Sequence, residues 1–170
     1  FVGFSYQFQV ALLATFFLEE KLFSINQVQS EIRKNSHDFD DIWCHREDGN
    51  MGFYVQAKNY TSNKIDILDD KVYFNGKEIL LKQNAINIIV TRNLHNLKNN
   101  SENNGFKYYK HNNLNLIVVQ LPSEAISDYI FTKFHPSRIN QIMSLANKRF
   151  TDFYSCVISE SDIPKLEFMP

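Results

Sequence analysis

Cysteine is scarce in this sequence. The two cysteines, Cys44 and Cys156, are far apart and belong to no CxxC or Cys/His pattern. Such spacing argues against a structural zinc module and against a disulfide framework, so we expect two reduced thiols. Reduced thiols indicate an intracellular protein, and we expect a cytoplasmic one.

Long hydrophobic runs are also missing. The longest apolar stretch, residues 10–18, is followed by Glu19 and Glu20 and is too short to span a bilayer. No basic segment precedes it, as a signal peptide would require. We therefore expect no membrane partner, and we expect Glu19 and Glu20 at a solvated helix end.

The sequence has no strong charge of either sign. Its formal net charge is -1 and its pI is about 6.6, so nucleic-acid binding would need a local basic surface. In the basic and aromatic segment 107–111, Lys107, Tyr109 and Lys110 are candidates for contacts with phosphates or bases; the alternative is a solvated loop. The five histidines lack metal-ligand spacing, and we expect them at the surface or in the core.

Apolar residues are abundant. Hydrophobic residues make up 44% and aromatic residues 14% of the 170 residues, which is enough for one sizeable core in an α/β or α+β domain. The chain begins at Phe1 and ends at Pro170, and we expect it to be part of a longer polypeptide. We predict one domain over residues 1–158 and a tail or linker to a further domain over residues 159–170.

Hydrophobic periodicity predicts the elements of this domain. In the first half we expect a buried helix at residues 4–21, strands at 25–33, 41–46 and 51–59, a turn at 47–50 and a hairpin at 72–77. In the second half we expect a short helix at 78–84, strands at 85–91 and 114–120, a loop or mobile excursion at 96–113, and helices at 124–134 and from Pro136 to about residue 150. Ser123 is predicted to cap the first of these last two helices.

One predicted strand contains an unusual polar pair. Because side chains alternate along a strand, Gln56 and Lys58 point to one face, whereas Val55 and Ala57 point to the other. Taken alone, the pair is explained by a solvent-facing strand surface. The preceding segment is acidic, however, with Asp38, Asp40 and Asp41, and the turn at 47–50 brings its strand alongside Gln56 and Lys58. An acid, an amide oxygen and a lysine are therefore expected to converge.

Three motifs in this order resemble the PD-(D/E)XK nuclease superfamily, in its variant with Gln at the (D/E) position. They are Gly3-Phe4-Ser5-Tyr6-Gln7, Asp40-Asp41-Ile42-Trp43 and Val55-Gln56-Ala57-Lys58. The sequence most resembles the double-stranded DNA endonuclease domains of bacterial anti-phage defence effectors, which have an Mrr-like restriction endonuclease fold. The resemblance covers residues 1–91. It implies an αβββαβ core with a mixed central sheet flanked by helices, here followed by an extra C-terminal strand and helices.

The resemblance also implies a metal site. Asp41, Gln56 and the backbone carbonyl of Ala57 would bind Mg²⁺, with Mn²⁺ as a possible substitute, and Lys58 would orient or deprotonate the attacking water. Asp41 is preferred to Asp40 because it adjoins Ile42, as in the family motif. Because Gln replaces a carboxylate, we expect weaker metal binding than in a site with two acids.

Further ligands are left open by the motifs. Glu31, on the polar face of the preceding strand, is a candidate to add a carboxylate to the catalytic cluster. Asp38 is an alternative candidate for the same role, and the roles of the two residues are exchangeable. A glutamate of the first helix, Glu19 or Glu20, is an alternative additional ligand.

The function expected from this resemblance is metal-dependent hydrolysis of duplex DNA with little sequence preference, as the effector domain of a longer anti-phage protein with a separate sensor. We expect a homo-oligomer when active, because a double-strand break needs two hydrolytic sites. Two alternatives stay open. The first is an inactive nuclease fold used for binding or oligomerisation. The second is a nuclease acting on RNA or branched DNA, since the site of such a nuclease contacts a phosphodiester and not a base.

Overall fold

The computed structural model describes residues 4–30, 37–60, 64–94, 97–98, 100–151 and 156–165. The helices are α1 (Tyr6–Glu20), α2 (Ser123–Lys133) and α3 (Pro136–Phe150), with short 3-10 helices at Leu22–Ser24, Asn112–Leu114 and Glu160–Asp162. The strands are β1 (Ile25–Ser30), β2 (Ile42–Arg46), β3 (Phe53–Lys58), β4 (Ile65–Leu68), β5 (Lys71–Phe74), β6 (Lys77–Ile79), β7 (Ile86–Thr91), β8 (Ser101–Asn103), β9 (Phe106–His111), β10 (Leu116–Gln120) and β11 (Val157–Ser159).

Eight strands form one mixed sheet, in the order β11-β1-β2-β3-β7-β10-β9-β8. Strand β7 runs parallel to both of its neighbours, β3 and β10, and the other pairs are antiparallel. Strands β4, β5 and β6 form a separate antiparallel sheet. The predicted mixed α/β fold is confirmed. The restriction-endonuclease-like core remains a prediction.

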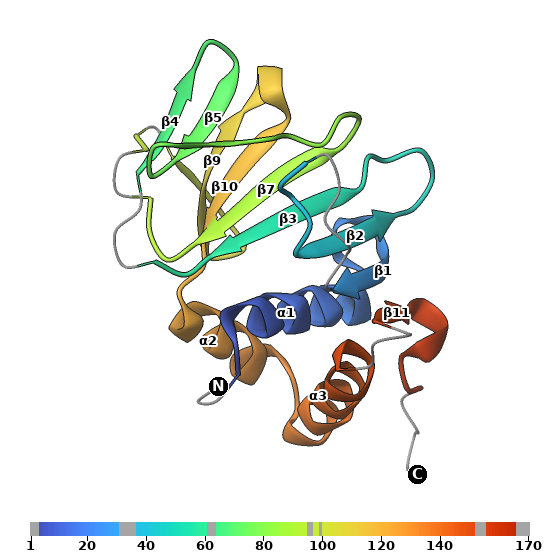
Figure 1. The fold of residues 1–170 in the computed structure, drawn as a ribbon. Helices are drawn as coiled ribbons and strands as arrows, with labels where there is room; N and C mark the ends of the chain where they lie inside the picture. Colours follow the sequence, from blue (N-terminus) through green and yellow to red (C-terminus); the bar gives the residue numbers. More distant parts are fainter. Residues whose placement is uncertain are drawn as a thin grey trace.

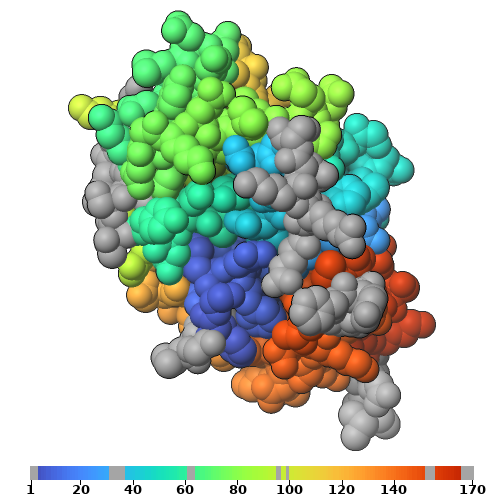
Figure 2. Space-filling model, in the orientation of Figure 1, coloured from blue at the N-terminus to red at the C-terminus, as the bar shows by residue number. Residues whose placement is uncertain are grey.

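Helix α1 is buried on nearly all sides. Ala11, Leu12 and Phe16 have no exposed surface, and the helix is apolar around its circumference, as is typical of a helix in the interior. It lies between the large sheet and the helices α2 and α3 (Figure 1), and one edge of it reaches the surface (Figure 2). Ser5 caps its first turn by accepting a hydrogen bond from the Phe8 N–H.

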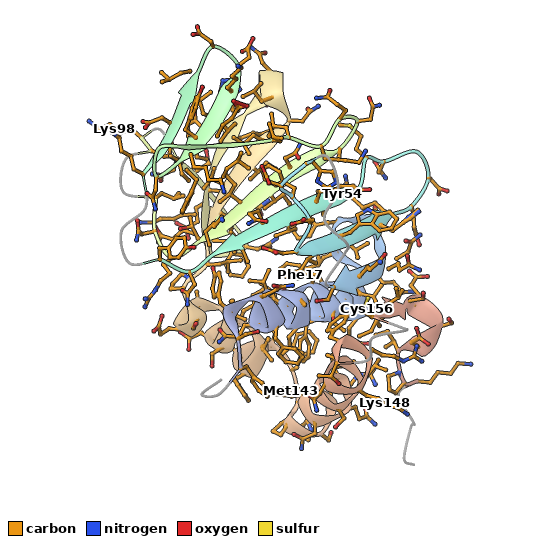
Figure 3. The ribbon with its side chains drawn as sticks, viewed as in Figure 1. Phe17, Tyr54, Lys98, Met143, Lys148 and Cys156 are labelled. Carbon is orange, nitrogen blue, oxygen red and sulfur yellow. The ribbon has the colours of Figure 1, made fainter. Side chains whose placement is uncertain are left out.

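The two faces of the large sheet are covered by different structures. One core combines α1, α2 and α3 with Val55, Val90 and Leu121 of the sheet and its edge. The other core contains buried residues of the small sheet and of the opposite face, including Ile89 and Val118, and no residue of these three helices. Tyr54 lies on this second face, on the side of β3 away from Phe17 of α1 (Figure 3). Within the described part of the chain, helices therefore cover only one face.

The predicted short helix at residues 78–84 is wrong. Residues Lys77–Ile79 form β6, and the residues that follow are not helical. Asn75 and Gly76 have φ values of 50° and 84°, as a tight hairpin turn requires, and the buried side chains of Val72 and Phe74 alternate with period two. The hairpin thus continues into the small sheet, which takes the place expected for a helix.

The segment expected as a loop or mobile excursion at residues 96–113 contains a second hairpin. Strands β8 and β9 pair across a turn at Asn104 and Gly105, whose φ values are 52° and 81°. The high asparagine content hides the alternation of Phe106 and Tyr108 on one face with Tyr109 on the other. This hairpin completes the sheet edge next to β10.

Several element boundaries also differ from the expectation. Pro122, in an extended conformation, is the N-cap of α2, so Ser123 is the first helical residue and not the cap. Helix α3 begins at Pro136 as predicted. Strand β1 is described to Ser30; residues 31–33 of the predicted strand lie outside the described part. Strand β11 pairs with β1 and extends to Ser159, and the domain boundary at residue 158 remains a prediction.

Candidate active site at the carboxyl end of β3

The polar pair Gln56 and Lys58 lies at the carboxyl end of β3, where several elements meet. Lys58 is paired with Thr91 at the end of β7, and Thr91 with Gln120 at the end of β10. Strand β2 begins and α1 begins at this same edge. Ligands of α/β proteins bind preferentially beyond the carboxyl ends of parallel strands. The position of the pair is therefore suited to a functional site.

Asp41 is held beside Gln56 by three backbone contacts. Its N–H donates to the Val55 carbonyl at 3.1 Å, and its carboxylate Oδ2 accepts from the Ala57 N–H at 2.8 Å. The side-chain amide of Gln7, in the first turn of α1, donates to the Asp41 carbonyl at 3.2 Å. Two segments, β3 and the first turn of α1, thus fix the position of Asp41.

The Gln56 amide bridges Asp41 and Lys58. Its hydrogen bonds are satisfied when the nitrogen donates to Asp41 Oδ2, 3.2 Å away, and to the Asp38 carbonyl, while the oxygen accepts from Lys58 Nζ at 3.1 Å. Of the two neighbouring acids, the structure brings Asp41 and not Asp40 to this bridge. In this orientation of the amide, carboxylate, amide and ammonium form a continuous hydrogen-bonded row.

The carboxylate of Asp41 is partly removed from water. Burial raises the pKa of Asp41 above its ordinary value of 3.8, and the Asp40 carboxylate adds to the rise. The Ala57 N–H and the Lys58 ammonium oppose it by stabilising the charged form. A metal cation next to Asp41 would stabilise the ionised Asp41 carboxylate, as the Lys58 ammonium group does.

Aromatic rings surround the two lysines of this region. Lys58 Nζ lies 5.4 Å from the Phe74 ring centroid and 6.0 Å from that of Tyr60. Lys82 Nζ lies 5.5 Å from the ring centroid of Tyr54, on the same face of β3. Ring faces attract cations, so Phe74 and Tyr60 help to hold Lys58 at the carboxyl end of β3. Lys82 lies nearer the beginning of β7, where its backbone N–H donates to the Asn87 side chain.

The segment before β2 is held against the end of β6. Asp38 exchanges hydrogen bonds with Leu80: its N–H donates to the Leu80 carbonyl at 2.8 Å, and its carboxylate accepts from the Leu80 N–H at 2.7 Å. The Asp38 carboxylate is therefore engaged in joining the two sheets, while its carbonyl faces Gln56.

His37 is a buried member of this segment, with 4% of its surface exposed. Its Nδ1 accepts from the Phe39 N–H at 3.2 Å, and its Nε2 has no hydrogen-bond partner among the described residues. Burial and then Lys82 lower the pKa of His37, against the opposing effect of Asp40 and Asp38. His37 is therefore neutral at neutral pH.

The predicted metal ligands offer hard oxygen donors. The N–H and C=O of one strand residue point to the same neighbouring strand, so the Ala57 carbonyl lies on the Asp41 side, where the Ala57 N–H already bonds. Mg²⁺ often uses one or two protein carboxylates, with water and phosphate oxygens completing its shell. Asp41, Gln56 Oε1 and the Ala57 carbonyl fit this pattern.

Carboxylate-rich or thiolate-rich clusters are not found in the described ranges: no three His, Cys, Asp or Glu side chains there gather as a metal site. Glu31, predicted as a further carboxylate, lies outside the described residues.

The glutamates of α1 are at the opposite end of the helix from Gln7. Glu19 pairs with Arg138 of α3, with N···O distances of 2.7 Å, and Glu20 accepts a 2.7 Å hydrogen bond from the Tyr129 hydroxyl of α2. Glu19 is twelve positions after Gln7, which corresponds to roughly 18 Å of helix. Neither glutamate is a solvated helix end or a ligand beside Asp41, so both expectations are wrong.

The three candidate DNA-binding residues do not share one surface. Tyr109 packs against the core beneath the small sheet, and Lys107 is on that same face of β9. Lys110 lines a cavity on the other face. The structure thus separates Lys110 from the other two, and DNA contact by any of them remains a prediction.

Residues that the sequence analysis did not select also border the site, notably Tyr54, Phe74 and Lys82. Tyr54 and Phe74 come from strands of the two facing sheets, and Lys82 comes from the connection between β6 and β7. No local pattern marks them, because their proximity depends on the position of the small sheet. Gln7, in contrast, belongs to the first of the three motifs.

Both cysteines are free thiols, as expected: Cys44 is buried and Cys156 partly so. No described helix has the length and apolar character needed to cross a membrane. Comparison of the chain with protein-family models, with curated proteins and with solved structures finds no match.

Proposed function

We propose that this chain is a Mg²⁺-dependent endonuclease domain that hydrolyses phosphodiester bonds of double-stranded DNA with little sequence preference. One observation supports the proposal most: Asp41, Gln56 and Lys58 form a hydrogen-bonded row at the carboxyl end of β3. A carboxylate, an amide oxygen and an ammonium group are the functional groups that metal-assisted phosphodiester hydrolysis uses.

Asp41, Gln56 Oε1 and the Ala57 carbonyl would hold the metal ion. When bound, Mg²⁺ or Mn²⁺ neutralises charge on the phosphate and lowers the pKa of a bound water. Lys58 contributes a positive charge and three N–H donors, which orient the attacking water or a phosphate oxygen. Hydrolysis consumes that water, forms one P–O bond and breaks another.

The Gln56 amide links metal binding to the position of Lys58. In the orientation that satisfies its hydrogen bonds, the amide nitrogen faces Asp41 and the amide oxygen accepts from Lys58. To offer Oε1 to an ion beside Asp41, the amide must turn over, and this breaks its hydrogen bond with Lys58. Metal binding would thereby release the ammonium group for the substrate.

The direct test uses supercoiled plasmid. Nicking or linearisation should occur with Mg²⁺ or Mn²⁺, stop in chelator and return when the ion is restored. Ca²⁺ should bind but support little cleavage, because its coordination is looser. Undiminished cutting in chelator would disprove the mechanism.

The same assay tests the alternatives. Duplex binding without cleavage under any of these ions would favour a binding module, and faster cleavage of RNA or of a branched junction would change the substrate class.

Double-strand cleavage requires two active sites of opposite polarity, whereas this chain supplies one Gln56–Lys58 pair. We therefore propose that the active form is a homo-oligomer, within a longer anti-phage protein whose other part senses the trigger. Cleavage rate should rise more steeply than linearly with protein concentration, while the ratio of linear to nicked product also rises. A strictly linear dependence with an unchanged product ratio would contradict self-association.

A further inference from the structure

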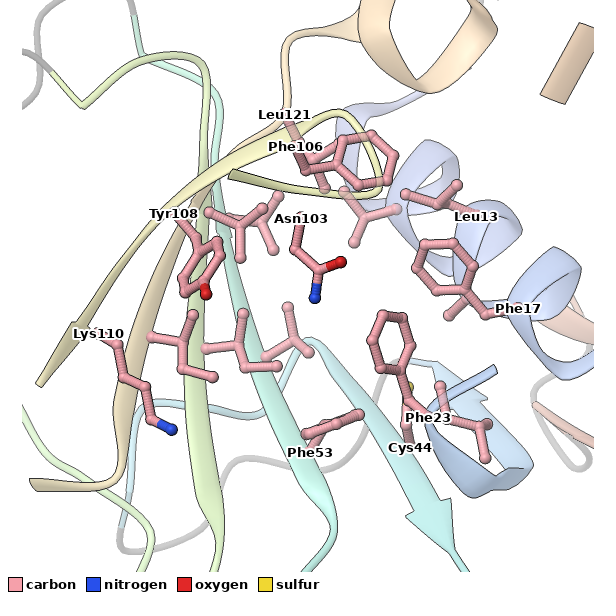
Figure 4. A pocket seen from close by; sticks show the side chains of 18 residues that line it. Leu13, Phe17, Phe23, Cys44, Phe53, Asn103, Phe106, Tyr108, Lys110 and Leu121 are labelled. Carbon is pink, nitrogen blue, oxygen red and sulfur yellow. The ribbon is translucent and has the colours of Figure 1, made fainter. Parts of the chain in front are cut away.

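An apolar cavity lies on the face of the large sheet opposite to Gln56 and Lys58. Its volume is about 300 Å³, at the lower end of the range of about 300–1,000 Å³ for small-molecule sites. Helix α1 forms one wall with Leu13, Ala14 and Phe17, and strands β3, β7 and β10 form the floor (Figure 4). The cavity opens to solvent, because Phe23, Asn103 and Lys110 among its lining residues are exposed.

The polar side chains of the β8–β9 hairpin lie at one side of this cavity, where Asn103 and Lys110 are exposed to solvent. Asn103, Tyr108 and Lys110, all in the β8–β9 hairpin, line it opposite α1 (Figure 4). No hydrogen bond or ion pair joins these three side chains to another described residue. None of the described residues that line the cavity is acidic, so Lys110 is a cation without a balancing charge there.

A strained aromatic residue borders the same space. Phe23 has a φ of 57°, which is rare and costly for an aromatic residue, and 39% of it is exposed. Its ring lies 5.4 Å from Phe17 and 6.3 Å from Phe53, measured between centroids. The Phe23 ring thus borders the cavity next to Phe17 and Phe53.

We propose that this cavity binds a small apolar carboxylate of the size and character of a medium-chain fatty acid. The apolar body would contact the α1 wall and the strand floor, where its removal from water is favourable. Its carboxylate would pair with Lys110, and the Asn103 amide and Tyr108 hydroxyl are available as further donors. The proposal is independent of nuclease activity, because Gln56 and Lys58 project from the other face.

Binding is tested with dodecanoate, measured by calorimetry and by the change in Tm. Saturable binding of one molecule per chain and a rise in Tm are expected. Lys110→Gln should weaken dodecanoate binding about fivefold, as expected for one partly exposed ion pair, and leave binding of the uncharged 1-dodecanol unchanged. Lys107→Gln is the matched control: it removes a lysine from the same strand but on the opposite face, and should have no effect.

A second variant fills the cavity. Ala14→Leu adds apolar volume to the α1 wall without loss of helix propensity, so the protein should stay folded and bind neither compound. Far-UV circular dichroism and Tm without ligand establish that it is folded. The proposal is overturned if the parent shows no saturable dodecanoate binding, if folded Ala14→Leu binds like the parent, or if Lys107→Gln and Lys110→Gln weaken binding equally.

Discussion

The side-chain nitrogen of Gln7 and the backbone carbonyl of Asp41 are 3.2 Å apart, which ties the first turn of α1 to the residue before β2. Gln7 does not touch the Gln56–Lys58 pair itself, so it would act as a positioning residue. It fixes the backbone from which the Asp41 carboxylate projects toward the Ala57 N–H.

Gln7→Ala should therefore reduce the rate of DNA cleavage more than it affects substrate binding. We expect kcat to fall about tenfold with little change in KM, as for the loss of one hydrogen bond, and stability to fall by about 1 kcal/mol. Steady-state cleavage and urea unfolding measure the two effects. Gln9→Ala is the control, since the Gln9 amide donates to the carbonyl of Phe4, which precedes the same helix, and not to Asp41. Equal losses of kcat in both variants would contradict a specific role for Gln7.

Lys58 can be distinguished from an ordinary strand lysine by mutation. As a catalytic residue, Lys58→Ala should abolish cleavage while duplex binding persists, because its contribution falls in the transition state. Loss of its hydrogen bond to Gln56 should cost about 1 kcal/mol, so the variant should stay folded.

The matched control is Lys71→Ala. Its side chain is 59% exposed on β5 and only approaches Glu78, so plasmid cleavage should remain at the parental rate. Filter binding and a plasmid assay on the same preparations separate affinity from turnover. A well-folded Lys58→Ala protein that degrades duplex DNA at the parental rate would refute the proposed function.

Asp41 connects activity with pH. Its pKa is raised above 3.8 in the folded protein, mainly by burial, so the folded state holds this proton more tightly than the unfolded state. The resulting contribution to stability is fully present below pH 3.8 and is lost as the pH rises through the folded pKa. Metal binding needs the carboxylate, so the apparent Mg²⁺ affinity should fall as the pH is lowered through that same range.

Asp41→Asn removes this titration but keeps an oxygen for the Ala57 N–H. It should abolish Mg²⁺-dependent cleavage and, at neutral pH, raise the Tm relative to the parent. The Tm difference between the two proteins should shrink as the pH falls toward 3.8. Thermal unfolding at several pH values in chelator measures it. A parent that is more stable than Asp41→Asn throughout this range would mean that the carboxylate is stabilised, not strained, by its surroundings.

Local sequence patterns were sufficient for the elements that form the site. The apolar run of α1, the alternation in β3 and the β-branched content of β7 each predicted the observed element within a few residues. The convergence of Asp41 with Gln56 and Lys58 also followed from these patterns, because a hairpin places β2 beside β3.

What could not be predicted depends on contacts between distant segments. The alternation of Val72 and Phe74 predicts a strand, but it does not reveal that the small sheet covers the second face of the large sheet. It also does not reveal that Lys82 lies beside the Tyr54 ring. Glu19 and Glu20 were predicted to be solvent-exposed, because two adjacent acidic residues at a helix end are usually exposed. Their partners, Arg138 and Tyr129, come more than a hundred residues later.

The ion pair between Glu19 and Arg138 joins α1 to α3. The side chains are only 14% and 8% exposed, and two guanidinium nitrogens donate to the carboxylate. Removing one partner leaves the other charge buried without a counter-charge, so Glu19→Ala should lower the free energy of unfolding by about 3–5 kcal/mol. Replacing both residues, as Glu19→Leu with Arg138→Met, should recover much of this loss.

The surface pair of Lys64 and Asp66 is the control for this prediction. Its side chains are 71% and 36% exposed and 3.9 Å apart, so Asp66→Ala should cost less than about 1 kcal/mol. Urea unfolding of the four proteins gives the comparison. Because Glu19 lies at the opposite end of α1 from Gln7, cleavage per folded molecule should not change in Glu19→Ala. Equal small losses in Glu19→Ala and Asp66→Ala would show that burial does not strengthen the pair, and a specific loss of cleavage would place Glu19 in communication with the distant site.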